Sequence, residues 1–375
     1  MKVFIVHASA GAGHFKAAQA VYNYLKENYK DIDAKLIDIL DQTNALFRFN
    51  YKWGYSWLIK SIPLLWQLAF WITYNKPLRV FTRPLASLVN KLNTRKFRGL
   101  LLKENPDFII STHFLSSEIA AYLKNSKKIS SEVITIITDF GVHPFWLSAG
   151  TDIYIVASGF TKKLLLSEGV EEDRVREFGI PIDSKFLVNY SKVELCNKLS
   201  VDINKFTVLI MTGSFGIGPI REIVDLLYKD VQILVVCARN KKLYTDLKAK
   251  NYQNVRVYDF IDNIHELMAV SDMIVTKPGG LSISELLAME LVPVFISPIP
   301  GQETANIDAL KSYGVGERAD NAPDIEAIVL HYREHKEDLA RVKEKIRKIK
   351  KPFAAGELCD AVCKGGPGFS GRGAF

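Results

Sequence analysis

The sequence predicts an α/β protein with two doubly wound domains that face each other across a cleft. Short apolar segments rich in β-branched residues alternate with segments of helical character, which is typical of a parallel sheet with crossover helices. The alternation stops at residues 179–183, Gly-Ile-Pro-Ile-Asp, and then starts again. A length of 375 residues also fits two domains of ordinary size. Ligands of such sheets bind at the carboxyl ends of the strands, so we expect a ligand in the cleft.

The first half opens with a strand at residues 2–7, a glycine-containing turn and a helix at residues 16–29. Further strands of this half are expected at residues 34–39, 108–111, 133–138 and 153–157. Strands of the second half are expected at residues 207–212, 231–237, 255–258, 273–276 and 292–296. Its helices are expected at residues 219–227, 264–270, 282–289 and 304–312.

These elements divide the chain into an N-terminal domain of residues 1–182 and a C-terminal domain of residues 183–352. The last helix of the C-terminal domain lies in the highly charged segment 331–351 and could pack back on the N-terminal domain. After Pro352 glycine becomes frequent and the periodic apolar pattern is lost. Residues 353–375 are therefore expected to be a flexible tail.

Composition excludes several classes of protein. With 48% apolar and 24% charged residues, the chain is too apolar for a disordered protein. Its four cysteines form no C-x-x-C pair, which argues against a disulfide scaffold and a structural zinc site. The N-terminus enters a strand without a signal-peptide pattern, and no apolar stretch approaches the ~20 residues that span a bilayer. We therefore expect a cytoplasmic protein without a transmembrane helix.

Basic charge is concentrated in residues 42–103. This window contains eleven Lys and Arg residues and no Asp or Glu, although the net charge of the whole chain is only +8. It also holds four of the five tryptophans, namely Trp53, Trp57, Trp66 and Trp71. Aromatic side chains together with cations are typical of segments that bind an anionic membrane surface. One alternative is a non-catalytic protein that binds membrane or single-stranded nucleic acid, and another is packing of the tryptophans in the domain core.

Polar residues follow two strands of the first half. Gly13 and His14 belong to a Gly-Ala-Gly-His turn at the start of a helix, where free backbone N–H groups can bind an anion. Asp139 directly follows an apolar strand, with His143 and Trp146 shortly after it. An imidazole or carboxylate at a strand end is suited to acid–base catalysis, so His14 is the first candidate for a general base and Asp139 the second. An ordinary turn and a helix cap are the alternatives.

Three turns of the second half follow strands in the same way. They contain Gly213 and Ser214 in the first turn, Gly279, Gly280, Leu281 and Ser282 in the second, and Gln302 and Glu303 in the third. Glycine turns at helix N-termini bind phosphate, and the carboxylate of Glu285 could accept hydrogen bonds from a ribose. Together the turns indicate a nucleotide-diphosphate site. Ser282 and Glu285 also have capping-box spacing, so helix capping is the alternative.

With these motifs the chain resembles the bacterial diacylglycerol glucosyltransferases and plant monogalactosyldiacylglycerol synthases, which are similar to glycosyltransferase family 28. The resemblance rests on Gly11-Ala-Gly-His14, Thr138-Asp-Phe140 with His143 and Trp146, Thr276-Lys-Pro-Gly-Gly280 with Glu285, and Pro300-Gly-Gln-Glu303 with Asn306. It extends over roughly residues 1–350. The turn at residues 213–216 departs from the glycine- or alanine-rich loop that members often have. The resemblance implies a GT-B fold of two Rossmann-like domains, a UDP-sugar donor, inversion at the anomeric carbon, and neither a cofactor nor a required metal.

The resemblance also implies transfer of glucose or galactose to diacylglycerol by a protein that is peripheral on the inner face of the cell membrane and has no nucleic-acid partner. The implied donor contacts are Glu285 with the ribose, Phe260 and Ile261 with the uracil, and Gln302 and Glu303 with the sugar. His143, Trp146 and the tryptophans of the basic window would serve the acceptor and the membrane. An alternative, from a more distantly similar family, is transfer of N-acetylglucosamine to a polyprenyl-linked peptidoglycan precursor.

Overall fold

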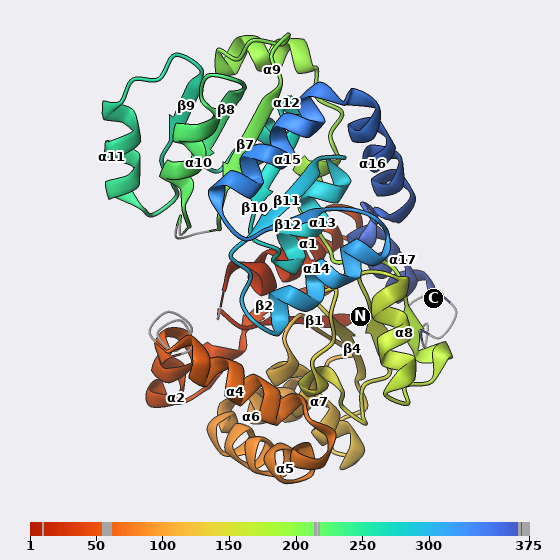
Figure 1. The fold of residues 1–375 in the computed structure, drawn as a ribbon. Helices are drawn as coiled ribbons and strands as arrows, with labels where there is room; N and C mark the ends of the chain where they lie inside the picture. The colour runs from red at the N-terminus through yellow and green to blue at the C-terminus, as the bar shows by residue number, and fades with distance from the viewer. Residues whose placement is uncertain (10, 55–61, 214–215, 217, 367–368, 370–375) are drawn as a thin grey trace. The chain divides into compact units, whose positions relative to one another are not determined.

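The structure is a computed structural model that describes residues 1–375 except 10, 55–61, 214–215, 217, 367–368 and 370–375 (Figure 1). The chain forms two compact units. Unit 1 contains Met1–Asp183, Ile299–Ala305 and Phe353–Phe375, and unit 2 contains Ser184–Pro298 and Asn306–Pro352. Each unit holds a six-stranded parallel sheet with helices packed on it. The prediction of two doubly wound α/β domains is confirmed.

The sheet of unit 1 has the strand order β2-β1-β3-β4-β5-β6. Its strands are β1 (Lys2–His7), β2 (Asp33–Asp38), β3 (Phe108–Ser111), β4 (Glu132–Ile136), β5 (Ile153–Ile155) and β6 (Val175–Arg176). The chain order reverses between β1 and β3, which pair directly, from Val3 opposite Phe108 to Val6 opposite Ser111. This reversal is the topological switch point, where sheets of this kind bind their ligands.

Alternating side chains of β1 enter two cores on opposite faces of the sheet, as the two-residue period of a strand requires. Val3 and Ile5 join a cluster with helix α1 (Ala12–Asn28), whereas Phe4 and Val6 join a cluster with α6 (Arg95–Glu104) and α7 (Phe114–Asn125). Both faces of this strand are therefore fully buried, which explains its uninterrupted apolar sequence.

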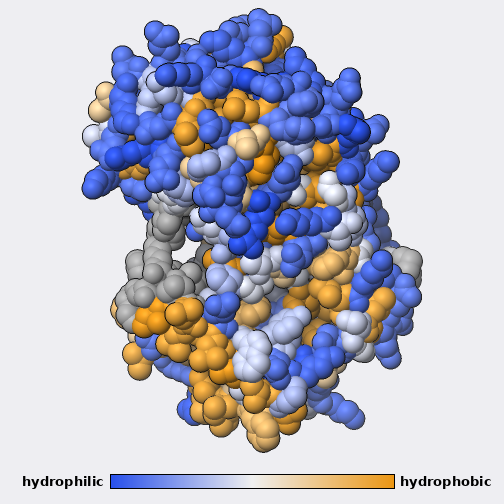
Figure 2. Space-filling view, viewed as in Figure 1, coloured by the Kyte–Doolittle hydropathy of each residue, from blue (hydrophilic) through white to orange (hydrophobic). Residues whose placement is uncertain are grey.

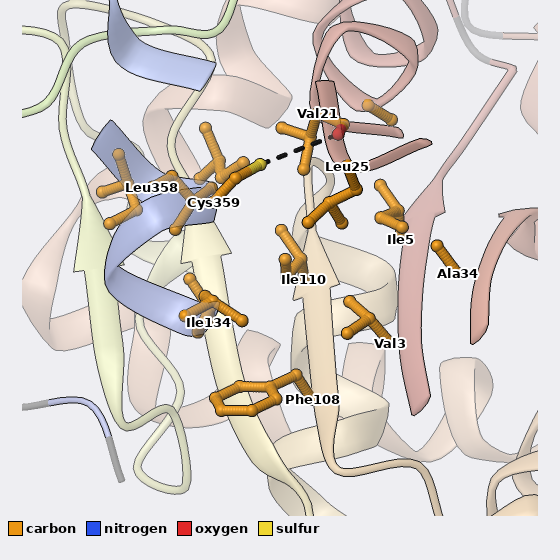
Figure 3. Packing of buried hydrophobic residues seen from close by; sticks show 14 of the residues in the cluster. Val3, Ile5, Val21, Leu25, Ala34, Phe108, Ile110, Ile134, Leu358 and Cys359 are labelled. Carbon is orange, nitrogen blue, oxygen red and sulfur yellow. Dashed lines mark hydrogen bonds between the residues drawn. The ribbon is translucent and has the colours of Figure 1, made fainter. Parts of the chain in front are cut away.

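The expected flexible tail is wrong for much of residues 353–375. Helix α17 (Ala354–Lys364) packs against α1, and its Leu358, Cys359 and Val362 are completely buried in the same core as Val3 and Ile5. Figure 3 shows Cys359 beside Val21 of α1, whose carbonyl oxygen lies 3.7 Å from the thiol sulfur. The glycines at residues 365–373 lie only beyond the C-terminus of this helix, whereas its buried residues recur at positions 355, 358, 359 and 362 with the period of an amphipathic helix.

The described residues of the basic window 42–103 form helices between β2 and β3. They are α2 (Ala45–Phe49), the π-helical turn η2 (Asn50–Gly54), α4 (Pro63–Tyr74), α5 (Lys76–Asn93) and α6, and they follow the 3-10 turn η1 (Ile39–Gln42). Helix α8 (Gly159–Ser167) and the turns η3 (Pro144–Trp146) and η4 (Glu172–Arg174) complete the named elements of unit 1. No helix in the described part of the chain is long and apolar enough to cross a membrane.

The sheet of unit 2 has the strand order β12-β11-β10-β7-β8-β9. Its strands are β7 (Thr207–Met211), β8 (Gln232–Val236), β9 (Val255–Tyr258), β10 (Met273–Thr276), β11 (Val292–Ile296) and β12 (Glu317–Ala319). Its helical elements are η5 (Ser184–Leu187), α9 (Lys192–Leu199), α10 (Ile220–Leu227), α11 (Lys241–Ala249), α12 (Ile264–Val270), α13 (Gly280–Ala288), α14 (Gln302–Ser312), α15 (Ala322–Glu334) and α16 (Lys336–Ile349). The first residues of α14 belong to the segment Ile299–Ala305 and therefore to unit 1. The switch point of this sheet lies between β7 and β10.

The charged segment 331–351 lies in α15 and α16, and α16 packs within unit 2 on β11 and α13. The helix that returns to the N-terminal domain is therefore α17 and not this segment. The short edge strands β6 and β12 were not predicted. Their sequences, Val-Arg and Glu-Arg-Ala, have no apolar run because an edge strand is only partly covered.

Candidate active site

His14 lies at the switch point of unit 1. Helix α1 begins at Ala12, earlier than the predicted residue 16, so Gly13 and His14 belong to its first turn. The N-cap is Gly11, whose φ of 133° is readily adopted only by glycine. This tight turn leads the chain from the end of β1 into the helix and brings the His14 imidazole next to the end of β3.

The hydrogen bonds of His14 determine which ring nitrogen carries the proton. Its Nδ1 lies 2.7 Å from the carbonyl oxygen of Thr112, and the Thr112 hydroxyl donates in return to the His14 carbonyl at 2.8 Å. A carbonyl oxygen can only accept, so Nδ1 must be the protonated nitrogen of the neutral ring. The hydroxyl of Thr138 lies 2.9 Å from the same Nδ1. The Nε2 atom therefore keeps its lone pair and can accept a proton.

The electrostatic surroundings keep His14 neutral. Burial lowers its pKa to about 4, against a weaker raising effect of the hydrogen bond to Thr112, while nearby His7 lowers it further. His7, the last residue of β1, is itself buried, and desolvation lowers its pKa as well. A neutral imidazole with a free Nε2 is the form that a general base needs.

Another histidine beside His14, His113, was not predicted from the sequence. It is the N-cap of α7, its Nδ1 accepts the N–H of Leu115 at 3.1 Å, and its ring centroid lies 4.7 Å from that of His14 in an edge-to-face arrangement. Desolvation lowers its pKa well below the ordinary value. The signal was present, because Thr112 and His113 directly follow the apolar strand β3, but only the pairing of β3 with β1 places them beside His14.

Asp139 and Gln302, two predicted site residues from distant parts of the sequence, meet within unit 1. The side-chain amide of Gln302 donates to the Asp139 carboxylate at 2.9 Å, and Asp139 is buried. Glu303, the next residue, accepts the N–H of Ile299 at 2.7 Å and so holds its own loop together. The turn before α14 is therefore a defined structure built on the carboxyl end of β4.

The predicted phosphate turns lie at the switch point of unit 2. Because β7 and β10 pair with Met211 opposite Thr276, the turns after these two strands start side by side. In the first turn Gly213 has a φ of 77°, whereas Ser214 lies outside the described residues. In the second, Gly279 is the N-cap of α13 and supplies no side-chain cap, so the backbone N–H groups of the first turn can bind an anion.

The residues of α13 do not form a capping box. Gly280, Leu281 and Ser282 all belong to the first turn, and the helix has no side-chain cap from Ser282. Glu285 lies further along the helix and is 5% exposed. The capping alternative is therefore wrong, and Glu285 is a buried carboxylate on the helix that begins at the second phosphate turn. Phe260 is exposed and Ile261 half-buried, directly after β9.

The aromatic residues expected on the acceptor side divide into two groups. Trp146 is 4% exposed and packs in a core cluster with Tyr154 and Leu165, so it does not lie on a membrane-facing surface; its ring centroid is 6.2 Å from that of His14. Trp66 is half-buried and Trp71 is exposed, both on α4. The side chain of Trp53 and all of Trp57 lie outside the described residues.

Both ring nitrogens of His143 lie within hydrogen-bonding distance of other residues of unit 1. It is the N-cap of η3, where its Nδ1 accepts the N–H of Phe145 at 3.2 Å, and its Nε2 lies 3.2 Å from the hydroxyl of Thr73 on α4. Desolvation, assisted by Arg79, lowers its pKa to about 4. This histidine therefore joins α4 to the loop after β4. No group of three His, Cys, Asp or Glu side chains among the described residues could hold a metal ion.

Comparisons with known proteins agree with this geometry. Residues 14–182 match the family described as monogalactosyldiacylglycerol (MGDG) synthase, and residues 207–352 match the glycosyltransferase family 28 C-terminal domain. Each half of the chain is therefore similar to a glycosyltransferase family. A processive diacylglycerol beta-glucosyltransferase of Bacillus cereus (strain G9842) is 28% identical over 367 residues, which cover 96% of this chain and 93% of the relative. Its namesake in Staphylococcus carnosus is 28% identical over 370 residues, covering 96% and 91% of the two chains.

Solved structures confirm the GT-B fold of this glycosyltransferase. MurG of Acinetobacter baumannii aligns with a TM-score of 0.61 at 15% identity, covering 97% of this chain and 99% of that protein. A putative UDP-N-acetylglucosamine 2-epimerase from Listeria monocytogenes aligns with a TM-score of 0.63 at 12% identity, covering 100% and 99%. At these identities the likeness shows the fold alone.

Proposed function

We propose that this glycosyltransferase transfers glucose or galactose from a UDP-sugar to the hydroxyl of diacylglycerol at an anionic membrane surface, with inversion at the anomeric carbon. The observation that carries the proposal is the neutral His14, whose Nε2 lone pair lies at the switch point of the unit that matches the MGDG synthase family. The names of the relatives at 28% identity support diacylglycerol as the acceptor and glucose as one donor sugar.

The proposed reaction is a single displacement. Nε2 of His14 takes the proton of the acceptor hydroxyl while its oxygen forms a bond to the anomeric carbon. The bond from that carbon to the β-phosphate oxygen breaks, and UDP leaves with the electron pair. Because attack comes from the side opposite UDP, an α-linked donor gives a β-glycoside. Asp139 is the second candidate for the base, but its bond with Gln302 suits it better to holding the loop that we assign to the sugar.

On the donor side, we assign the diphosphate to the uncapped N-terminus of α13 and to the turn at Gly213. Glu285 binds the ribose hydroxyls, Phe260 and Ile261 bind the uracil, and Gln302 and Glu303 bind the sugar. The position of Glu285 supports this role, because it is a buried carboxylate on α13, the helix whose N-terminus we assign to the diphosphate.

Glu285→Ala is expected to weaken UDP binding without unfolding the protein. Loss of charge-assisted hydrogen bonds costs about 1.5–3 kcal/mol, which corresponds to about 10–150-fold in Kd. Calorimetric titration with UDP measures the effect, and Glu344→Ala, which removes an exposed carboxylate of α16, should leave Kd unchanged. Equal UDP affinity of Glu285→Ala and the wild type would contradict the ribose assignment.

We propose that α5 forms part of the membrane-binding surface, because its apolar side chains face solvent and its polar side chains face the rest of unit 1. Its polar side chains turn toward unit 1: Arg79 bonds to Glu168 at 2.8 Å, and Asn90 bonds to Glu118 at 2.7 Å. Its exposed apolar side chains follow at intervals of three and four residues along one face, namely Leu78, Phe81, Leu85, Leu88 and Leu92. A helix of a soluble domain normally buries such a face, so its exposure indicates a partner phase that is itself apolar.

Helix α4 extends this apolar surface. It has no charged residue, and Leu64, Leu68 and Trp71 are more than half exposed. Figure 2 shows the hydrophobic residues of α4 and α5 in orange on one side of unit 1. Together these side chains define the apolar surface of α4 and α5. A lipid bilayer suits it as a partner, because the proposed acceptor is dissolved in one.

The cations of the basic window 42–103 contribute less to membrane affinity than their number implies. Arg48 pairs with Asp41, Lys52 with Asp38, and Lys76 and Arg79 both pair with Glu168. These four cations pair with three acids that flank the window or lie beyond it, so three of the four charges are already compensated. We therefore expect apolar burial to supply most of the membrane affinity, and the other cations to supply a salt-sensitive preference for anionic lipids.

Product analysis tests the proposed function. The protein is incubated with UDP-glucose or UDP-galactose and phosphatidylglycerol vesicles that contain dioleoylglycerol, and the lipids are examined by mass spectrometry and proton NMR. The expected product is a hexosyl diacylglycerol with the large anomeric coupling of a β-glycoside. An α-glycoside would refute inversion. Transfer of N-acetylglucosamine to a polyprenyl-linked acceptor, with none to diacylglycerol, would refute the acceptor assignment.

A further inference from the structure

Helix α4 has two different faces, and its inner face contacts the loop that we assign to the donor sugar. The outer face carries Leu64, Leu68 and Trp71 of the apolar surface. On the inner face the ring of Phe70 lies against Gly301: a Cβ atom at Gly301 would be only 2.5 Å from Cδ1 and 2.6 Å from Cε1 of Phe70. Ile299–Ala305 belongs to unit 1, as α4 does, so this contact lies within one compact unit.

Further contacts join the same parts. The rings of Phe70 and His143 lie 4.8 Å apart, and Thr73, one turn along α4, meets the Nε2 atom of His143 at 3.2 Å. His143 follows Asp139 closely in the loop after β4, and Asp139 accepts the side-chain amide of Gln302. The donor loop is therefore contacted by Phe70 at Gly301 and by Asp139 at Gln302.

We propose that Phe70 is a positioning residue that couples the lipid-facing helix α4 to the donor loop Ile299–Ala305, so that membrane docking and UDP-sugar binding strengthen each other. The proposal rests on the proposed function, which gives the outer face of α4 to the bilayer and the loop to the sugar. Docking removes the outer face from water and restrains α4. Because Phe70 packs directly on Gly301, a restrained α4 also restrains the loop, and the sugar then binds to a loop that is already ordered.

Thermodynamic linkage makes the coupling reciprocal and measurable. If vesicles tighten UDP-sugar binding by a given factor, the UDP-sugar must tighten vesicle binding by the same factor. We expect vesicles to lower the Kd for the UDP-sugar by about fivefold or more, because coupled binding sites typically change each other's affinity by about 5–150-fold. UDP alone should show less coupling than the UDP-sugar, because the loop is assigned to the sugar and not to the nucleotide.

The experiment measures Kd for UDP, UDP-glucose and UDP-galactose by calorimetry, with and without phosphatidylglycerol vesicles that lack diacylglycerol, so that no transfer occurs. In the wild type, vesicles should lower Kd for the UDP-sugar that serves as donor. In Phe70→Ala this effect should disappear while vesicle binding persists, since Leu64, Leu68 and Trp71 remain. Phe70→Leu, which keeps an apolar side chain against Gly301, should restore much of the coupling.

Trp71→Ala is the matched control, because it removes a neighbouring aromatic ring from the opposite, exposed face of α4. It should weaken vesicle binding but keep the wild-type coupling once vesicles are in excess. Absence of coupling in the wild type, or full coupling in Phe70→Ala, would overturn the proposal. A protein that transfers sugar to diacylglycerol yet shows either result would refute only this inference, whereas a protein that binds no UDP-sugar would refute the proposed function itself.

Discussion

Replacing His14 by alanine is expected to abolish sugar transfer to diacylglycerol while UDP still binds. The substitution removes the Nε2 lone pair that takes the acceptor proton, and loss of a general base typically costs about 10²–10⁴-fold in rate. Initial rates of glycolipid formation measure the effect, and calorimetry with UDP provides the binding control. His335→Ala, which removes an exposed histidine of unit 2, should retain full activity.

Asp139→Asn distinguishes the two candidates for the base. It keeps a side chain that can bond to Gln302, so a modest loss is expected if His14 is the base. Inactivity of Asp139→Asn, together with most activity left in His14→Ala, would reverse the assignment.

The pH dependence of the wild type tests the state of His14 independently. Because burial lowers its pKa to about 4, the imidazole stays neutral as pH falls through 6.5 and becomes protonated only near pH 4. The base is thus competent above pH 4, and kcat/KM should hold its value across pH 5–7 and fall on the acid side near pH 4. An acid limb near pH 6.5 would instead indicate a solvated imidazole and contradict the burial of His14.

Replacing both Phe81 and Leu85 by serine is expected to release the protein from vesicles. These side chains are 78% and 65% exposed on α5, so the substitutions should not disturb the core. Each side chain that enters the bilayer contributes about 1.5–3 kcal/mol, and loss of both should weaken vesicle binding by about 100-fold or more. Sedimentation with phosphatidylglycerol vesicles measures the binding. Transfer to a short-chain diacylglycerol dispersed in detergent should change little.

The control for this pair replaces exposed apolar residues outside the apolar surface of α4 and α5. Phe353→Ser and Val193→Ser remove side chains that are 63% and 58% exposed, and vesicle binding should stay at the wild-type level. If both double variants bind equally well, α5 is not the docking helix. If Phe81→Ser with Leu85→Ser loses activity equally on vesicles and on the dispersed acceptor, its effect is on the fold and not on docking.

Local patterns were sufficient to predict the central strands of both sheets and to name candidate site residues. Val3 to Val6 are apolar without interruption because both faces of a central parallel strand are covered, and such a run is visible in the sequence itself. The polar candidates that follow these strands in the turns and helices after them, among them His14, Asp139 and Glu285, could be named for the same reason. A change from apolar to polar residues marks the carboxyl end of a strand, where doubly wound sheets bind their ligands.

Residues that lie close together along the chain encode the two α/β domains, the nucleotide-type turns, and the basic and aromatic window, so each of these could be recognised without the structure. Which of these parts meet depends on the folded chain. The pairing of β1 with β3 brings Thr112 to His14 and sets its tautomer; the return of Ile299–Ala305 to unit 1 brings Gln302 to Asp139 and Gly301 to Phe70. The outward turn of the apolar face of α5 likewise depends on Glu118 and Glu168, which hold its polar face from other elements of unit 1. Contacts between residues far apart in sequence leave no local periodicity, so only the folded chain reveals them.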